Sequence, residues 1–270
     1  MPRFDPDQLE KWSCGTWKEH PQVDISGFSI DSRKINSGDL FVALKAERDG
    51  HDFLSSAEEN GACASIVEQV KLNVPLPQLL VKDSLQAFHN IAYQHRLKFK
   101  GPVVGITGSC GKTSTKDILG LLLGEDKALS TEGNLNNHLG VPLTLLRCDN
   151  HKHQYAVVEA GINQIGEMSM LAKTISPSIV LVTIIAPSHL EGLETIENIA
   201  SEKADLFTKS DLIQTVIFPE DCLKYEKFQD RYKSGEGVIV LREREPTSNP
   251  SQLEAFYSIW TETNKMGNSS

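Results

Sequence analysis

Residues 105–114 read Gly-Ile-Thr-Gly-Ser-Cys-Gly-Lys-Thr-Ser. The β-branched run at 102–104 before them predicts a strand, and the pattern over 116–123 after them predicts a helix. A glycine-rich turn between a strand and a helix lets backbone N–H groups converge on an anion, and the helix N-terminus adds partial positive charge. In this setting Lys112 is expected to reach the terminal phosphates of a nucleotide, and the Thr113 hydroxyl to contact Mg²⁺.

The loop departs from the strict phosphate-binding pattern. That pattern places a glycine five residues before Gly111, where this chain has Ile106, and the glycines stand instead at 105, 108 and 111. The alternative is a plain glycine-rich turn. The strand-turn-helix setting favours nucleotide binding, with these residues in the cradle: Gly108, Ser109, Cys110, Gly111, Lys112, Thr113 and Ser114.

Composition narrows the class of protein. A chain of 270 residues is long enough for two domains. Its net charge of −9 gives no basic stripe, which argues against nucleic acid as the main partner. No apolar run approaches the roughly 20 residues of a membrane helix, and the start of the chain lacks the apolar core of a signal peptide. The five cysteines are scattered without a CxxC pair, which indicates reduced thiols and a cytoplasmic location.

Two segments separate near residue 100. The first, 1–100, contains short strand-like runs and two predicted helices, 53–60 and one capped by Asp83 or Ser84. In the second, 101–270, predicted strands and helices alternate, which indicates a parallel α/β sheet whose ligands bind at the carboxyl ends of its strands. The predicted strands are 39–44, 64–67, 78–81, 102–107, 155–159, 179–185 and 213–218, and the helices of the second segment are 113–123, 165–174 and 195–209.

Polar residues follow these strands. Glu159 ends one strand, His189 lies in the loop after the next, and Lys203 stands on the following helix. In a doubly wound sheet these positions gather around the phosphate loop, so Glu159 and His189 are expected to reach a metal beside the phosphates. Each residue alone is more often structural than functional; their order after a phosphate loop favours function.

Several blocks together carry a resemblance to a known family. The chain resembles the Mur ligases of bacterial cell-wall synthesis, and most closely the MurF type, the UDP-N-acetylmuramoyl-tripeptide:D-alanyl-D-alanine ligases. The blocks span roughly residues 25–210 and are 31–34, 38–44, 49–53, 107–114, 133–146, 159–161 and 188–191. The GNLNN and GVPLTLL runs and the His-Leu-Glu at 189–191 favour MurF over the related MurE type.

The resemblance implies a reaction and its participants. ATP would phosphorylate the terminal carboxylate of a UDP-linked muramoyl-tripeptide, and the amine of D-alanyl-D-alanine would attack the acyl phosphate. One Mg²⁺ would bind through Thr113 and Glu159 and a second through His189. Lys112, His189 and Lys203 would be catalytic, with Lys203 carbamylated. Asn134, Asn137, Ser32 and Arg33 would contact the substrate, the last two at its UDP end.

Two departures from the family leave alternatives open. Ile184 replaces a frequent asparagine, and the chain ends before the adenine-contacting residues and the third, amine-binding domain that MurF-like enzymes have. We therefore expect an N-terminal fragment or truncated product, against a shorter protein with a native end. The rival functions are a MurE-like or folylpolyglutamate synthetase-like ligase, and a nucleotide-binding module without catalysis. The Ser32-Arg33 domain argues against the folate branch.

Overall fold

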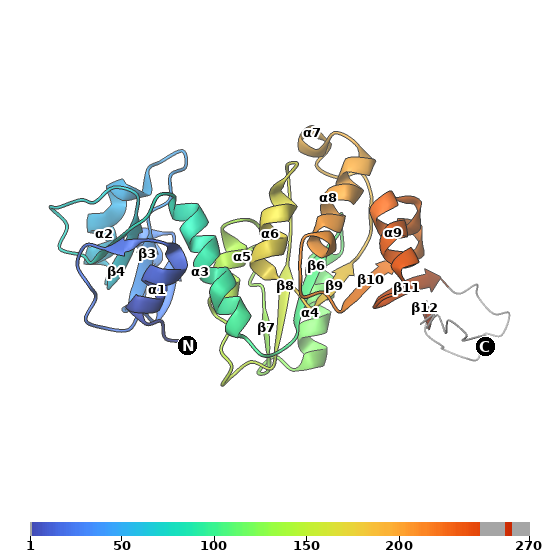
Figure 1. Ribbon diagram of the computed structural model, residues 1–270, viewed down its shortest axis with the longest axis horizontal. Coiled ribbons are helices and arrows are strands. Elements are labelled where there is room, and N and C mark those ends of the chain that lie inside the picture. Colours follow the sequence, from blue (N-terminus) through green and yellow to red (C-terminus); the bar gives the residue numbers. More distant parts are fainter. Residues whose placement is uncertain (1, 244–256, 261–270) are drawn as a thin grey trace, which may run out of the picture. The chain divides into compact units, whose positions relative to one another are not determined.

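The computed structural model describes residues 2–243 and 257–260, which form two compact units (Figure 1). The first unit is Met1–Gly101 with Leu139–Gln154, and the second is Pro102–His138 with Tyr155–Ser270. The division after Gly101 lies at the boundary predicted from the sequence. Residues 139–154, however, belong to the first unit and not, as their place in the sequence suggested, to the second.

Contacts within the first unit explain this assignment. Helix α5 (Gly140–Leu145) packs against α3 (Ser84–Lys98). His95 Nε2 lies 2.8 Å from the carbonyl oxygen of Cys148, and the Asn150 side-chain amide donates to the Lys98 carbonyl at 2.9 Å. Such long-range contacts are not visible in a pattern of local periodicity.

The first unit is built on a five-stranded sheet in the order β1-β5-β4-β3-β2. The strands are β1 (Thr16–Trp17), β2 (Gly27–Ser29), β3 (Asp39–Val42), β4 (Ala64–Val67) and β5 (Gln78–Leu80). Only the β1–β5 pair is antiparallel. The remaining elements are α1 (Pro6–Ser13), α2 (Leu54–Glu59) and 3₁₀ turns at Ser32–Lys34 and Gly50–Phe53.

The second unit contains a seven-stranded sheet in the order β12-β11-β10-β9-β6-β8-β7, parallel except for the β11–β12 pair. The strands are β6 (Val103–Thr107), β7 (Ala128–Ser130), β8 (Tyr155–Glu159), β9 (Ile179–Val182), β10 (Thr215–Pro219), β11 (Val238–Glu243) and β12 (Tyr257–Trp260). The helices are α4 (Lys112–Leu123), α6 (Glu167–Ile175), α7 (Leu190–Leu193), α8 (Ile196–Thr208) and α9 (Glu226–Ser234), with a 3₁₀ turn at Glu220–Lys224.

Helices pack on both faces of this sheet. On one face, Gly105 of β6 leaves room for Leu206 of α8, since a Cβ there would lie 3.3 Å from that side chain. On the same face, Phe218 of β10 packs edge-on against Phe228 of α9, with ring centroids 5.1 Å apart. On the opposite face, Leu119 and Leu123 of α4 join one apolar cluster with β6, β8 and β9.

The structure confirms the mixed α/β fold with parallel sheets. The predicted strands 64–67 and 155–159 match β4 and β8. The sequence analysis predicted no element after the strand at 213–218, but α9 spans Glu226–Ser234 and β11 begins at Val238. The four apolar residues at 238–241 form a strand because β10 is available for parallel pairing. Residues 244–249 lie outside the described residues.

Two simpler expectations concern the whole chain. All five cysteines are free. Among the residues that the structure describes, no helix has the length and apolar character needed to cross a membrane.

Candidate nucleotide and metal site

The glycine-rich loop connects β6 to α4, as predicted. Gly108 and Gly111 have φ angles of 144° and 79°, in the region that L-residues with side chains rarely adopt. A Cβ on Gly108 would also collide with the Thr183 hydroxyl. Backbone conformation therefore requires glycine at both positions, and close packing requires it at Gly108 as well. Helix α4 begins directly after Gly111 with its N-terminus at the loop.

The loop is fixed to the segment that follows β9. The Ser109 amide donates to the Ile184 carbonyl at 2.8 Å, and the Ser109 hydroxyl donates to the Ala186 carbonyl at 2.7 Å. The Thr183 hydroxyl donates to the Cys110 carbonyl at 2.6 Å. Since Ile184 uses its backbone for this contact, the loss of the family's usual asparagine side chain leaves the connection in place.

Lys112 is the first residue of α4 and is partly buried. Its ammonium donates to the Gly108 carbonyl at 2.9 Å, so the side chain folds back over the loop. An ammonium held there stands where a bound phosphate would need a positive charge.

Glu159, at the carboxyl end of β8, is buried and faces the start of α4. Its carboxylate accepts hydrogen bonds from the Thr113 hydroxyl at 3.1 Å and from the Asn136 side-chain amide at 2.8 Å. The Glu159 amide donates to the Thr131 hydroxyl at 3.0 Å. The structure therefore brings together Thr113 and Glu159, the pair that the sequence analysis selected for a metal.

Asn136 is a site residue that the sequence analysis missed. It stands between the two predicted residues Asn134 and Asn137, and both of these side chains are exposed. Asn136 also accepts the Gly161 amide on its backbone carbonyl at 2.8 Å, which fixes it beside the end of β8. The 133–137 block was the available signal, but the conformation of the loop decides which asparagine faces Glu159.

The structure does not join His189 to this pair. His189 precedes α7, has a φ angle of 50° and is exposed. Over the described residues, no hydrogen bond links its ring to Thr113 or Glu159, and no three or more His, Cys, Asp or Glu residues form a group that could hold a metal ion. A metal-binding role for His189 stays a prediction.

Lys203 lies on α8 with 2% of its surface exposed. No hydrogen bond to its ammonium is present in the described part of the chain. Burial, and secondarily the positive charge of Lys112, lower the pKa of Lys203 from 10.5 to about 8, although Glu202 opposes the shift. The Lys112 ammonium is thus within electrostatic range of Lys203.

Ser32 and Arg33 lie in a 3₁₀ turn of the first unit. The Asp31 carboxylate caps this turn and accepts two hydrogen bonds from the Arg33 guanidinium, both at 2.9 Å. Arg33 thereby lowers the pKa of Asp31 to about 2. Ser32 is buried, whereas Arg33 is exposed. The Asp31–Arg33 pair was not anticipated from the sequence.

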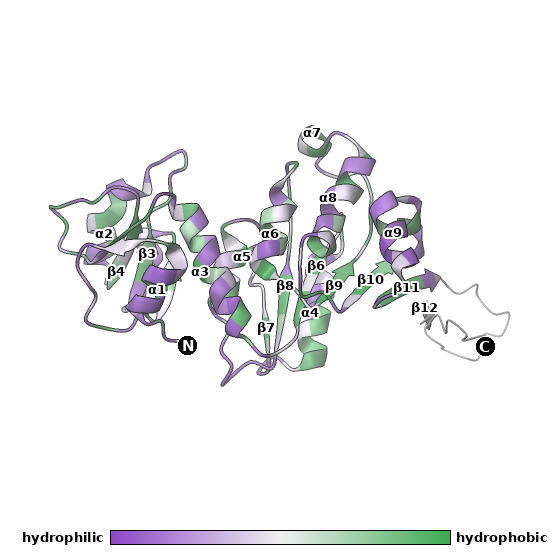
Figure 2. Ribbon diagram, in the orientation of Figure 1, coloured by the Kyte–Doolittle hydropathy of each residue, from purple (hydrophilic) through white to green (hydrophobic). Residues whose placement is uncertain are grey.

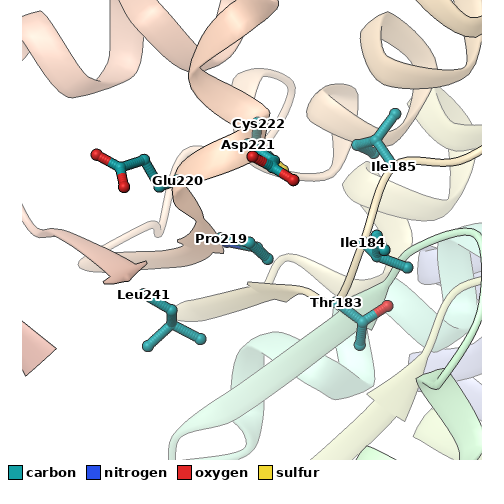
Figure 3. A pocket seen from close by; sticks show the side chains of 8 residues that line it. All are labelled: Thr183, Ile184, Ile185, Pro219, Glu220, Asp221, Cys222 and Leu241. Atoms are coloured by element: carbon teal, nitrogen blue, oxygen red, sulfur yellow. The ribbon is translucent and has the colours of Figure 1, made fainter. Parts of the chain in front are cut away.

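A pocket of about 520 Å³ opens at the carboxyl ends of β9, β10 and β11 (Figure 3). Thr183, which holds the phosphate loop through Cys110, forms part of its wall. The lining combines apolar side chains with two carboxylates: Thr183, Ile184, Ile185, Pro219, Glu220, Asp221, Cys222 and Leu241.

Comparison with known protein families gives two matches. Residues 106–256 match the Mur ligase middle domain, and residues 24–96 match the Mur ligase family catalytic domain. The 24–96 match lies within the first unit. The 106–256 match lies within the second unit, except for residues 139–154, which belong to the first.

Individual proteins extend this result. The chain is 41% identical over 188 residues to a UDP-N-acetylmuramoyl-tripeptide–D-alanyl-D-alanine ligase of Escherichia coli, covering 69% of this chain and 41% of that protein. The Bacillus subtilis enzyme of the same name is 35% identical over 212 residues, covering 76% and 46%. The chain thus spans about half the length of the curated relatives it matches.

Solved structures give the same family. A crystal structure of MurF from Acinetobacter baumannii has a TM-score of 0.82 and 32% identity, covering 91% of this chain and 56% of that one. MurF from Thermotoga maritima in complex with ADP has a TM-score of 0.67 and 31% identity, covering 80% and 49%. Because the middle-domain match alone extends over more than half of the residues, this chain belongs to the Mur ligase family.

Proposed function

We propose that this chain carries the ATP-binding and UDP-muramoyl-peptide-binding parts of a ligase that joins D-alanyl-D-alanine to UDP-N-acetylmuramoyl-tripeptide. The observation that carries the proposal is the pairing of Thr113 with buried Glu159 beside a phosphate loop that Lys112 covers. The relatives named for this reaction, and the ADP complex of the similar MurF ligase from Thermotoga maritima, support it.

The arrangement suits the activation of a carboxylate. A carboxylate resists attack by an amine because an oxide would have to leave, and phosphorylation supplies phosphate as the leaving group. Transfer of the phosphoryl group requires positive charge around its oxygens. In this chain the Lys112 ammonium and the amides at the start of α4 would hold that charge in place.

The residues present fit a magnesium ion. Mg²⁺ prefers oxygen ligands and binds through one or two protein groups together with water and phosphate oxygens. The Thr113 hydroxyl and the Glu159 carboxylate provide such oxygens, and Asn136 orients the carboxylate from its other side. When bound, the ion would neutralise negative charge on the phosphates. A second Mg²⁺ at His189 remains part of the proposal without a contact to support it.

We also propose that Lys203 becomes carbamylated. An unprotonated amine attacks CO₂, forms an N–C bond and releases one proton, so a lowered pKa makes the reactive form accessible near neutral pH. Lys203 is buried and lacks a hydrogen-bonded partner in the described part of the chain, and its pKa is about 8. The anionic product would face the cationic Lys112, which replaces repulsion between two ammonium groups by attraction.

Carbamylation predicts a specific spectroscopic signal. With ¹³C-labelled bicarbonate at pH 8, we expect one carbamate carbon resonance in the intact chain and none in Lys203→Arg, because the guanidinium does not form the product. Lys116→Arg is the matched control and should keep the resonance. Lys116 is also buried, but its ammonium donates to the Thr131 carbonyl at 2.8 Å. A resonance that persists in Lys203→Arg, or its absence from the intact chain, would contradict the assignment.

The first unit is proposed to bind the UDP end of the substrate through Ser32 and Arg33. The Asp31 carboxylate holds the guanidinium in one orientation, and its planar N–H groups suit a diphosphate. The buried Ser32 beside it provides a neutral donor for an oxygen of the substrate.

The double change Ser32→Ala and Arg33→Ala should lower the affinity for UDP-N-acetylmuramoyl-tripeptide about tenfold, the loss expected for one charge-assisted hydrogen bond. Affinity for MgADP should stay unchanged, because the phosphate loop lies in the other unit. Calorimetric titration of both ligands measures this. Arg3→Ala is the control, since Arg3 is also an exposed guanidinium near a carboxylate, that of Asp24 at 3.9 Å. Equal loss of both affinities would indicate a folding defect and would contradict the assignment of Ser32 and Arg33 to the UDP end.

A second candidate is a module that binds nucleotide without turnover. Phosphate release from ATP in the presence of UDP-N-acetylmuramoyl-tripeptide and D-alanyl-D-alanine separates the two. Binding of both ligands without phosphate release supports the module. Release that requires a single amino acid in place of D-alanyl-D-alanine would instead indicate the MurE-like reaction.

A further inference from the structure

Helix α4 contains a buried lysine, Lys116, about one turn after the phosphate loop. It is 4% exposed, and its ammonium donates to the Thr131 carbonyl at 2.8 Å. The Asp117 carboxylate lies 3.0 Å from the same ammonium, but that side chain is 61% exposed. Burial of an ammonium carries a desolvation cost that an apolar side chain of similar length avoids. Lysine is therefore not the residue that stability alone favours at this position.

One face of α4 runs along the ends of β7 and β8. Three residues spaced three and four apart share that face: Thr113, Lys116 and Gly120. Thr113 donates to Glu159 at the end of β8. Lys116 reaches the residue directly after β7, and a Cβ on Gly120 would lie 2.8 Å from the hydroxyl of the last β7 residue, Ser130. The C-terminal half of α4 is apolar and green in Figure 2, so its polar contacts with the strand ends gather in the half that begins at the phosphate loop.

Thr131 is held through each of its polar groups and is 2% exposed. Its amide donates to the Val157 carbonyl at 3.0 Å, and its hydroxyl accepts the Glu159 amide at 3.0 Å. These two contacts join Thr131 to β8, whereas the contact of its carbonyl with Lys116 joins it to α4. Without the ammonium, a buried carbonyl would lose its partner, which is costly unless the backbone moves.

Glu159 depends on Thr131 in two ways. Its amide is bound by the Thr131 hydroxyl, and its carboxylate is bound by Asn136, which belongs to the loop that begins at Thr131. Within the described residues, the hydrogen-bond partners of the carboxylate are the Asn136 amide and the Thr113 hydroxyl, and both are neutral. The negative charge of Glu159 is thus left for a cation, while its position is set by the residues that surround Thr131.

We propose that Lys116 is a positioning residue of the magnesium site, because by holding the Thr131 carbonyl it keeps the Glu159 carboxylate beside the Thr113 hydroxyl. This role deepens the proposed function and rests on it. Lys116 acts through Thr131 and not by contact with the ion. Mg²⁺ demands near-ideal octahedral geometry, so a small displacement of one carboxylate lowers its affinity. A charge-assisted hydrogen bond is stronger than a neutral one, which explains the use of an ammonium as the anchor.

The gain in ADP affinity on addition of Mg²⁺ tests the proposal. Calorimetric titration of the full chain with ADP, once with Mg²⁺ and once with EDTA, gives this gain as a ratio of two dissociation constants. Lys116→Met keeps the length of the side chain and removes the donor. We expect it to lower the gain about tenfold, the lower end of the effect of residues that orient metal ligands. The affinity for ADP in EDTA should stay within twofold, because the phosphate loop is unchanged.

Asp117→Asn is the matched control. It removes the exposed ion-pair partner of the same ammonium and leaves the contact with Thr131 in place. The gain should stay within twofold of that of the unchanged chain.

Thr131→Val breaks the same connection at its other end, since valine has the shape of threonine without the hydroxyl that accepts the Glu159 amide. It should lower the gain by a similar factor. The double variant with Lys116→Met should lower it by less than the product of the two separate factors, because both changes act on one carboxylate.

Amide hydrogen exchange of the ligand-free chain provides a measurement without metal. The Glu159 amide should exchange at least tenfold faster in Lys116→Met and at an unchanged rate in Asp117→Asn. Equal losses of ADP affinity with and without Mg²⁺ in Lys116→Met would indicate a purely structural role and would overturn the proposal, as would an unchanged gain or unchanged exchange. Failure of the unchanged chain to bind ADP in either condition would instead contradict the proposed function, and the exchange rate would still decide whether Lys116 fixes Glu159.

Discussion

Replacing Lys112 by alanine is expected to lower the affinity for MgADP about 100-fold, with no loss of folded structure. The ammonium folds over the loop and donates to the Gly108 carbonyl, so it is already placed where a phosphate would bind. Two charge-assisted hydrogen bonds to phosphate oxygens, at about 1.5 kcal/mol each, account for this loss. The side chain is only partly buried, and its truncation leaves the apolar contacts of α4 unchanged.

Calorimetric titration with MgADP measures the effect, and circular dichroism monitors the fold. Lys127→Ala is the matched control, since Lys127 is an exposed lysine just beyond the other end of α4. Its substitution removes the same charge without touching the loop and should leave the affinity within twofold. An unchanged affinity of Lys112→Ala for MgADP would contradict the assignment of the loop to nucleotide binding.

The second large effect concerns stability. Lys203→Met is expected to raise the free energy of unfolding by about 3 kcal/mol at pH 7 in CO₂-free buffer. The pKa of Lys203 is about 8 in the folded chain, against 10.5 without burial. At pH 7 both states are protonated, and the folded state bears the cost of a buried ammonium. Methionine has a similar shape without a charge, so the cost disappears.

The lowered pKa of Lys203 also predicts how the free energy of unfolding changes with pH. As pH rises through 8, the folded chain loses the Lys203 proton while the unfolded chain retains it up to about 10.5. The unchanged protein therefore gains stability over this window, and its difference from Lys203→Met should shrink to about 1 kcal/mol at pH 9.5. Urea denaturation at both pH values measures this, with Lys127→Met as the exposed control. A difference that is independent of pH would contradict the lowered pKa.

Local sequence patterns determined most of the second unit's elements and the position of the loop. The glycines at 108 and 111 predict a turn with backbone angles that favour glycine. The strand and the helix beside them follow from local periodicity. The pairing of Thr113 with Glu159 was also accessible, because carboxyl ends of parallel strands meet at one edge of a sheet.

Other features depended on contacts between distant residues. The sequence analysis selected Asn134 and Asn137 for the substrate and did not select Asn136, which the loop turns toward Glu159. The orientation of one residue in a loop has no periodic signature. The Asp31–Arg33 pair and strand β11 were missed for related reasons. Side-chain pairing and strand partners are decided by what lies nearby in space.

By itself the sequence determined the phosphate loop, the α/β fold and the family, because each depends on residue types at short and regular spacing. The tertiary structure was needed to show that residues 139–154 pack with the first unit and that Lys203 is buried within range of the Lys112 charge. Burial and electrostatic proximity are properties of the packed chain, and they arise from residues that the sequence separates by tens of positions.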